Sequence, residues 1–142
     1  MSKNINVILQ NMNANLIGFE NVIIDQISSI YSFSCDTINC SIGSFFDHGK
    51  FWTIIEILID KLKPNGQLII SLYDTRRIAA LYTNNQIQST DYLGLMKNIN
   101  NCVSLSDFVE FSSNKKDIIL ADIKKDQLIT NITIIKNPIT NG

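Results

Sequence analysis

Residues 57–70 read ILIDKLKPNGQLII, and this stretch combines the end of an amphipathic helix, a tight turn and a buried strand. The helix is predicted over residues 50–62, because seven apolar side chains fall along one broad face: Phe51, Trp52, Ile54, Ile55, Leu58, Ile59 and Leu62. Pro64 disfavours helical geometry at Lys63, and Asn65-Gly66 tolerates a tight turn, so the helix ends here. Residues 67–72 are almost all apolar, which predicts a strand covered on both faces. So short a turn implies a right-handed crossover from a strand near residue 40.

Shorter apolar runs predict further strands and helices on both sides of this unit. Towards the N-terminus, strands are expected over residues 5–9, 22–24 and 37–42, whereas residues 26–34 fit a one-turn helix or an irregular connection. Towards the C-terminus we expect helices over 76–82 (capped by Asp74 or Thr75) and 91–99, a strand over 107–111, and a hairpin of strands 116–123 and 128–135. Strands alternating with helices before an antiparallel ending predict one α/β domain over residues 1–142, with three layers and a mixed sheet.

The composition is that of a soluble globular protein. The chain has 142 residues, of which 45% are hydrophobic and 18% charged, and its net charge is −1. No basic field is available to attract nucleic acid or anionic lipid. No apolar run approaches the roughly 20 residues of a membrane span, and the N-terminus lacks the pattern of a secretory signal. We therefore expect a cytoplasmic monomer that binds neither nucleic acid nor membrane.

The sequence predicts no metal site. Cys35, Cys40 and Cys102 are odd in number and lack CxxC spacing, so we expect buried free thiols in a reducing compartment. His48 is the single histidine, and one histidine with dispersed cysteines does not make a recognisable zinc site.

The sequence also predicts no cofactor site. An α/β domain that binds a dinucleotide or a methyl donor needs a glycine-rich turn after its first strand, where the backbone approaches the ligand and a helix begins. The corresponding residues 10–15 read QNMNAN, and the first glycine after them is Gly18. The chain contains no GxGxxG, GxGxG or Walker sequence.

Several residues are candidates for catalysis or ligand binding. Asp47 and His48 could form a general base, but adjacent side chains rarely face each other, and a loop that caps the next helix explains both. Asp25, Asp36 and Asp74 lie at strand ends, where an acid can hold a ribose. Without the glycine turn, Asp25 is interpreted as a turn or cap residue.

The remaining candidates have structural interpretations as well. Arg76 and Arg77 fit either contact with an acidic partner or a solvated helix start, and the second interpretation is preferred. Phe45, Phe46 and Trp52 are interpreted as core side chains. The sequence therefore assigns no catalytic, cofactor-binding or metal-binding residue.

Three segments together resemble the second half of a class I (Rossmann-like) S-adenosylmethionine-dependent methyltransferase: residues 35–40, the helix 51–62 and the run LKPNGQLII at 62–70. Within this class, the chain is most similar to the N-terminal domain of the anamorsin (cytokine-induced apoptosis inhibitor) family. Members of that family resemble it in the early first strand, the missing glycine turn, the Leu-Lys-Pro-Asn-Gly-x-Leu-Ile run, a segment like LSDFVE at 105–110, and a closing strand like ITIIKNP at 132–138.

This resemblance implies a non-catalytic methyltransferase-like domain that works by protein contact in cytosolic iron–sulfur protein assembly. In the family, a flexible linker and a cysteine-rich domain follow, whose [2Fe–2S] and [4Fe–4S] clusters receive electrons from an NADPH-dependent diflavin reductase. We expect this chain to hold no cluster itself, because its three cysteines do not match the family's cluster ligands. The implied location is the cytoplasm, with the mitochondrial intermembrane space as a second compartment.

A second family remains as an alternative. The chain also resembles mRNA cap guanine-N7 methyltransferases, in the pair Asp36 and Cys40 and in the helix start DTRRI at 74–78. Those enzymes show a His-Tyr pair in the guanine pocket, where this chain has Phe45-Phe46. This resemblance implies a truncated or divergent S-adenosylmethionine-dependent enzyme.

Overall fold

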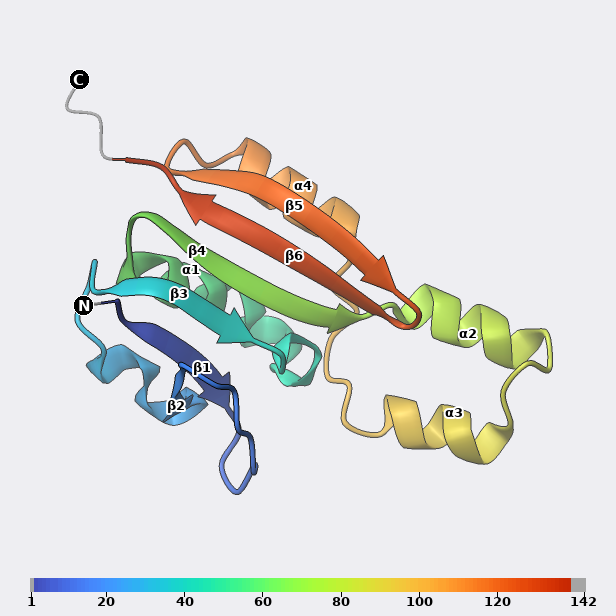
Figure 1. Cartoon of the computed structure of the whole chain (residues 1–142). Coiled ribbons are helices and arrows are strands. Elements are labelled where there is room, and N and C mark those ends of the chain that lie inside the picture. Colours follow the sequence, from blue (N-terminus) through green and yellow to red (C-terminus); the bar gives the residue numbers. More distant parts are fainter. Residues whose placement is uncertain (1, 139–142) are drawn as a thin grey trace.

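The computed structural model describes residues 2–138 and shows one six-stranded sheet with its helices (Figure 1). The strands are β1 (Asn4–Ile8), β2 (Glu20–Ile23), β3 (Cys35–Cys40), β4 (Leu62–Tyr73), β5 (Ile118–Asp126) and β6 (Ile129–Lys136). The α-helices are α1 (Phe51–Lys61), α2 (Thr75–Thr83), α3 (Ser89–Met96) and α4 (Leu105–Ser113), and the 3₁₀ helices are η1 (Ile24–Ser29), η2 (Gly43–Phe45) and η3 (His48–Lys50). None of the helices among residues 2–138 is long and apolar enough to cross a membrane.

The sheet has the strand order β2-β1-β3-β4-β6-β5. Its first four strands pair in parallel, and β6 runs antiparallel to both of its neighbours, β4 and β5. The predicted α/β domain with a mixed sheet and an antiparallel C-terminal hairpin is confirmed. The predicted crossover is confirmed too, because α1 connects the parallel strands β3 and β4.

The stretch 57–70 folds as helix, turn and strand, with almost no connection between them. Helix α1 ends at Lys61, and Leu62 already pairs with Cys35 of β3. Regular pairing then resumes only at Gln67, so residues 63–66 form a bulge. Asn65 has a φ of 67°, and a Cβ on Gly66 would lie 2.8 Å from the Lys63 carbonyl oxygen. The Asn-Gly pair is therefore required by the backbone.

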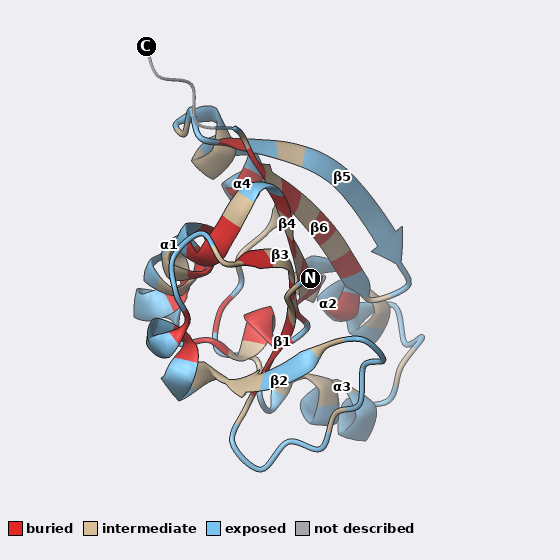
Figure 2. Cartoon of the chain, turned by 60° about the vertical axis from the view of Figure 1, so that its left-hand side comes forward, coloured by how far each residue is buried: buried red, intermediate tan, exposed pale blue. Residues whose placement is uncertain are grey.

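One face of the sheet carries the hydrophobic core, and α1 and α4 cover it (Figure 2). The strands contribute fully buried aliphatic side chains to this inner face, among them Ile5, Ile38, Leu68, Ile70, Ile132 and Ile134. The helices contribute an aromatic cluster, in which Trp52 packs on Phe51, Phe108 and Phe111 with ring centroids 4.6–5.0 Å apart. The interpretation of Trp52 and of the buried Phe46 as core residues is confirmed.

The opposite, outer face of the sheet differs from the prediction of three layers. In Figure 2, α1 and α4 lie on one side of the sheet, and no helix among residues 2–138 covers the other. Outer-face side chains such as Thr37, Asn39, Gln67, Ile69 and Ser71 are only partly buried. The prediction that residues 67–72 are covered on both faces is therefore wrong. The run as a whole is apolar, but its outer positions are Gln67, Ile69 and Ser71, and two of these three side chains are polar. The alternation of the strand, rather than its overall hydrophobicity, was the signal for an open face.

Residues 107–111 were predicted as a strand but belong to helix α4. Ser104 and Asp107 form a capping box: the Asp107 carboxylate accepts a hydrogen bond from the Ser104 backbone N–H at 2.8 Å. Phe108 is fully buried and packs this helix against the core. The Ser-x-x-Asp spacing is typical of a helix start. The prediction of a strand instead followed the aromatic and β-branched residues within 107–111, which are common in strands.

Candidate functional site

The C-terminal ends of the parallel strands meet at one edge of the sheet, called here the carboxyl edge. Strand β1 has β2 on one side and β3 on the other, so the chain changes direction at β1. In open α/β sheets, ligands bind in the crevice outside the strands at such a point. The crevice beyond Ile8 of β1 and Cys40 of β3 is therefore the first candidate site.

The connection that follows β1 lacks both parts of a cofactor cradle. Residues 9–19 run irregularly from β1 to β2 without a helix, so this connection presents no helix N-terminus to the crevice. Asn11 takes a φ of 66°, and the loop is held by a hydrogen bond from the Asn21 side-chain amide to the Ala14 carbonyl at 2.8 Å. Gly18, with a φ of 84°, lies next to the start of β2, far along the chain from the end of β1. The connection therefore lacks the helix N-terminus that binds a phosphate or carboxylate in such domains.

The cavity beside the ends of β3, β4 and β6, at the carboxyl edge, is small. Its volume is about 260 Å³, and Met12, Ser41, Phe45, Tyr73 and Asn131 are among its lining residues. Polar side chains here already pair with each other, since the Ser71 hydroxyl donates to the Asn131 side-chain oxygen at 2.6 Å. The volume lies below the roughly 300–1,000 Å³ of typical small-molecule pockets.

Neighbouring segments close the crevice from the β3 side. A Cβ on Gly43 would come within 2.9 Å of Leu72, so η2 packs directly against β4. The Ser44 hydroxyl accepts a hydrogen bond from the Tyr73 backbone N–H at 2.7 Å. Asn101, itself buried, donates to the backbone carbonyls of Gly43 and Phe46, both at 2.9 Å. The loop after β3 is thus fastened in place and leaves little room.

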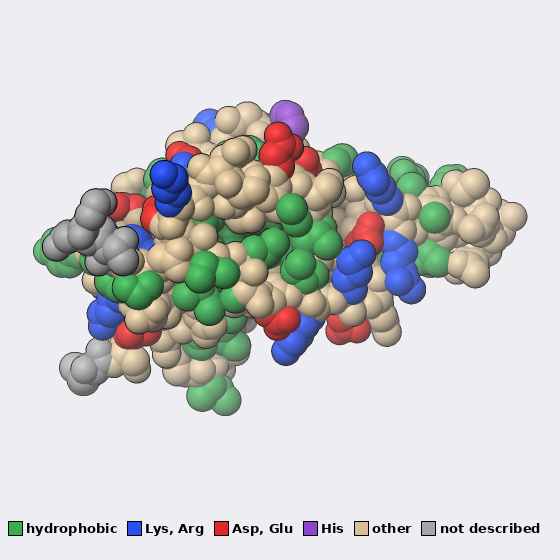
Figure 3. Space-filling model, turned by 90° about the horizontal axis from the view of Figure 1, so that it is seen from above, with side chains coloured by type: hydrophobic (Ala, Val, Ile, Leu, Met, Phe, Trp, Pro, Cys, Tyr) green, Lys and Arg blue, Asp and Glu red, His purple; other side chains and the backbone are tan. Residues whose placement is uncertain are grey.

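A larger groove opens beyond the end of β4, between the α2–α3 hairpin, the start of α4 and the tip of the β5–β6 hairpin. Its volume is about 1,180 Å³. Arg76, Arg77 and Lys125 line it, together with apolar side chains such as Leu105 and Val109. Figure 3 shows Lys and Arg side chains gathered at the neck where the α2–α3 hairpin leaves the body of the protein.

A third hollow, of about 820 Å³, lies at the opposite, amino edge of the sheet, and Lys136 at its side is a structural residue. The Lys136 ammonium donates to the backbone carbonyls of Ile59 at 3.1 Å and Leu62 at 3.2 Å, and lies 4.0 Å from the centre of the Phe33 ring. It thereby caps the C-terminus of α1. Burial lowers the pKa of Lys136, with the nearby Asp60 acting against this shift.

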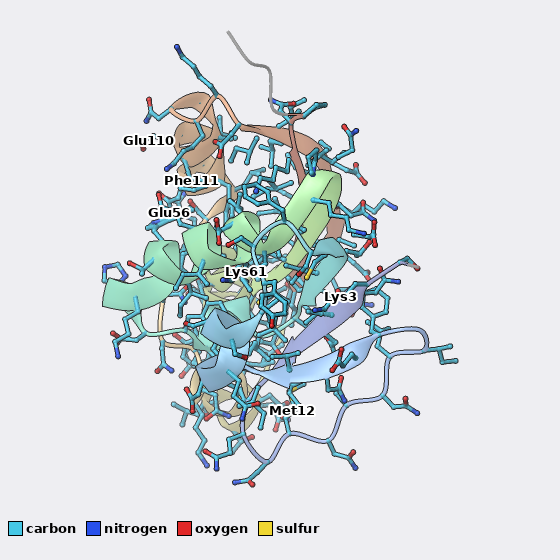
Figure 4. The ribbon with its side chains drawn as sticks, turned by 90° about the vertical axis from the view of Figure 1, so that its left-hand side faces the viewer. Lys3, Met12, Glu56, Lys61, Glu110 and Phe111 are labelled. Carbon is cyan, nitrogen blue, oxygen red and sulfur yellow. The ribbon has the colours of Figure 1, made fainter. Side chains whose placement is uncertain are left out.

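Glu56 of α1 and Phe111 of α4 lie at the same hollow (Figure 4). Glu56 forms an ion pair of 2.7 Å with Lys115, which holds the end of α4 against α1. This contact raises the pKa of Lys115. The Glu56–Lys115 pair therefore joins α1 to the residues that follow α4.

The candidate acids from the sequence are spread over the molecule. Asp74 caps α2 and accepts a hydrogen bond from the Arg77 backbone N–H at 3.1 Å, as predicted. Asp25 lies exposed in the first turn of η1, which agrees with a turn residue. Asp36 lies at the amino edge, where the Lys3 backbone N–H donates to it at 2.7 Å and lowers its pKa, with Lys63 adding to the effect.

His48 and Asp47 are both exposed, in the turn that leads into α1. The Asp47 side chain does not cap η3; its backbone carbonyl accepts a hydrogen bond from the Lys50 N–H at 2.9 Å instead. The assignment to a surface loop before the helix is confirmed, with Asp47 at the N-cap position of η3 but without a side-chain hydrogen bond there.

The thiols follow the prediction in two cases of three. Cys35 and Cys40 are buried, and burial raises the pKa of Cys40 to about 12. Cys102 is exposed at the groove beyond β4, contrary to the prediction. Residues 2–138 contain no group of three or more His, Cys, Asp or Glu side chains placed to hold a metal ion.

The groove beyond β4 was missed by sequence reasoning. Its residues come from four segments spread over positions 72–130, and the sequence gives no sign that these segments meet. The assignment of residues 107–111 to a strand also removed α4 from the carboxyl edge. The Ser104-x-x-Asp107 pattern was the signal that could have placed a helix start there.

Similarity to solved structures defines the class of fold. The chain superposes on a type 11 methyltransferase of Sulfolobus solfataricus described as putative, with a TM-score of 0.54, 14% identity, and coverage of 86% of this chain and 62% of that one. For the plantazolicin methyltransferase BpumL, in a complex with S-adenosylhomocysteine, these values are 0.59, 14%, 84% and 58%. For a SAM-dependent methyltransferase of Archaeoglobus fulgidus they are 0.57, 12%, 84% and 68%.

The chain therefore has the class I methyltransferase-like fold, as predicted. It spans about three fifths of the length of the first two of these structures. No model of a known protein family matches the sequence, and a search of curated proteins finds no relative.

Proposed function

We propose that this chain is a non-catalytic methyltransferase-like domain that acts through protein contacts. The observation that carries the proposal is the connection from β1 to β2, which has neither a glycine turn nor a helix where a methyl donor would be held. The cavity of about 260 Å³ at the same edge adds support. The Ser71 and Asn131 side chains beside it bond to each other.

The process proposed for the domain is cytosolic iron–sulfur protein assembly, on the strength of the resemblance to the anamorsin family. An NADPH-dependent diflavin reductase is the implied partner, and the clusters would belong to a separate cysteine-rich domain. The burial of Cys40 supports this division, because burial raises the pKa of this thiol to about 12, and a protonated thiol is a poor metal ligand.

Calorimetric titration tests the absence of methyl-donor binding. S-adenosylmethionine and S-adenosylhomocysteine are titrated into the chain, with an active class I methyltransferase as the positive control. We expect no binding heat from this chain. A dissociation constant in the micromolar range for either compound overturns the proposal. Binding of the purified reductase, measured by surface plasmon resonance, tests the place in iron–sulfur assembly separately.

The alternative function is a truncated or divergent S-adenosylmethionine-dependent methyltransferase, related to the mRNA cap guanine-N7 enzymes. The similarity to methyltransferase structures, one of them with S-adenosylhomocysteine bound, favours it. Transfer of a labelled methyl group to capped RNA would establish this alternative.

A further inference from the structure

We propose that the groove beyond β4 binds an acidic peptide segment of a protein partner that also carries apolar side chains. The groove is bounded by the α2–α3 hairpin, the first turn of α4 and the tip of the β5–β6 hairpin. The proposal rests on the proposed function, because it names the surface and the partner chemistry of a domain that acts by protein contact.

The size and position of the groove suit an extended segment. Its volume of about 1,180 Å³ is above the usual range for small-molecule pockets, and it exceeds those of the hollow at the amino edge and the cavity beside β3. Its walls come from separate elements, so a bound segment would contact the hairpin and the body of the protein together. Figure 1 shows that the α2–α3 hairpin projects beyond the end of the sheet.

The rim of the groove carries positive charge that residues 2–138 do not neutralise. Arg76, Arg77 and Lys125 are exposed, and no ion pair is found for any of them within the described part of the chain. The two acids at the groove are already engaged with backbone N–H groups: Asp74 with Arg77, and Asp107 with Ser104. The excess cations attract carboxylates of a partner.

The floor of the groove is apolar, and this favours a peptide over a nucleic acid. Leu72 and Leu105 lie beneath the rim, and Val109 is 48% exposed at the surface of α4. Aliphatic or aromatic side chains of a bound segment would cover these groups. A polyphosphate backbone would gain nothing from them, and the chain as a whole has a net charge of −1.

Fluorescence anisotropy tests the proposal with a defined probe. The probe is the labelled peptide Glu-Leu-Glu-Asp-Phe-Glu-Leu-Asp, and a second peptide replaces its acids by Gln and Asn. We expect the acidic peptide to bind, with an affinity that falls as salt is raised, and the neutral peptide to bind at least about tenfold more weakly.

Charge reversal then locates the site. The double variant Arg76→Glu with Arg77→Glu is expected to bind the acidic peptide at least about tenfold more weakly. Glutamate in the first turn of α2 favours the helix N-terminus, so this variant keeps its fold, which circular dichroism verifies. Lys50→Glu is the matched control, because Lys50 is exposed outside the groove. We expect it to bind the peptide as the unsubstituted chain does.

Three results overturn the proposal: no binding of the acidic peptide, equal binding of both peptides, or equal weakening by the Lys50 and the arginine substitutions. Tighter binding of a single-stranded RNA of the same length, lost in the arginine variant, overturns it in favour of nucleic acid. The S-adenosylmethionine titration reports on the proposed function independently, so failure of one proposal is distinguishable from failure of the other.

Discussion

The two faces of the sheet are built from alternate residues of the same strands, yet one face is buried under helices and the other is partly exposed to solvent. On β4, the inner residues Leu68 and Ile70 are fully buried under α1 and α4, whereas the outer residues Gln67, Ile69 and Ser71 are partly exposed. Parallel sheets normally have both faces covered. Here one face is covered by helices and the other tolerates water, and the difference lies in the side chains.

The outer face is made tolerant of water by a ladder of amides. The Asn39 side-chain N–H donates to the Asn6 side-chain oxygen at 2.9 Å, Asn6 donates to Asn21 at 3.1 Å, and Asn21 donates to the Ala14 carbonyl. The ladder crosses β3, β1 and β2 and ends on the loop that replaces a cofactor turn. The polar groups of this face therefore have partners without a covering helix.

The largest expected difference between the faces comes from two neighbouring isoleucines of β4. Ile70→Ala removes a fully buried side chain from the inner face and leaves a cavity, so we expect a loss of about 2–5 kcal/mol in the free energy of unfolding. Ile69→Ala makes the same chemical change on the outer face and should cost about 1 kcal/mol or less. Urea denaturation of both variants measures the two values. Equal losses would mean that the outer face is covered in solution.

A second substitution tests the end of the inner face, where β6 carries the buried Lys136 at a position that holds an aliphatic side chain elsewhere on this face. Lys136 follows Ile132 and Ile134 on β6 and caps α1. Lys136→Met keeps the length of the side chain but removes the donor that the ammonium supplies to the carbonyls of Ile59 and Leu62. We expect it to destabilise the protein by about 1–3 kcal/mol in chemical denaturation.

The pH dependence of the free energy of unfolding provides a separate check on the role of Lys136. Because its pKa is lowered in the folded state, the folded protein binds fewer protons than the unfolded chain as the pH approaches the ordinary lysine value of 10.5. Stability should therefore gain a positive contribution as the pH rises through this window, and Lys136→Met should lack it. If the variant is as stable as the parent at neutral pH, the capping role is wrong.

The contrast between the faces also explains what the sequence could predict. Helix α1, the turn at Asn65-Gly66 and strand β4 follow from periodicity, proline and glycine, which act locally. The open outer face could not be predicted, because it depends on the absence of a helix between β1 and β2 and on amides that meet across three strands. The groove beyond β4 was missed for the same reason: Arg77 and Lys125 come together only in the fold.

A smaller effect is expected from the amide ladder itself. Asn6 is 4% exposed and bonds to both neighbours in the ladder, so Asn6→Ala leaves Asn39 without its acceptor and Asn21 without its donor. Both neighbours can turn towards water, which limits the loss to about 1–2 kcal/mol. Thermal unfolding checks this value, and the double variant Asn6→Ala with Asn39→Ala should cost less than the sum of the two single substitutions. Strict additivity would show that the ladder does not act as a unit.

The smallest effect belongs to a charge that neither face buries. Asp36, at the amino edge, has a pKa below its ordinary value of 3.8, chiefly because the Lys3 backbone N–H donates to its carboxylate. The ionised form is thus favoured in the folded state, and its contribution to stability is present above pH 3.8 and is lost as the pH falls through the folded pKa. Asp36→Asn should flatten the acid limb of the curve of stability against pH, and leave the part above neutrality almost unchanged. If Asp36→Asn leaves the acid limb unchanged, other carboxylates cause the loss of stability at low pH. The hydrogen bond from Lys3 then contributes nothing measurable to the pH dependence.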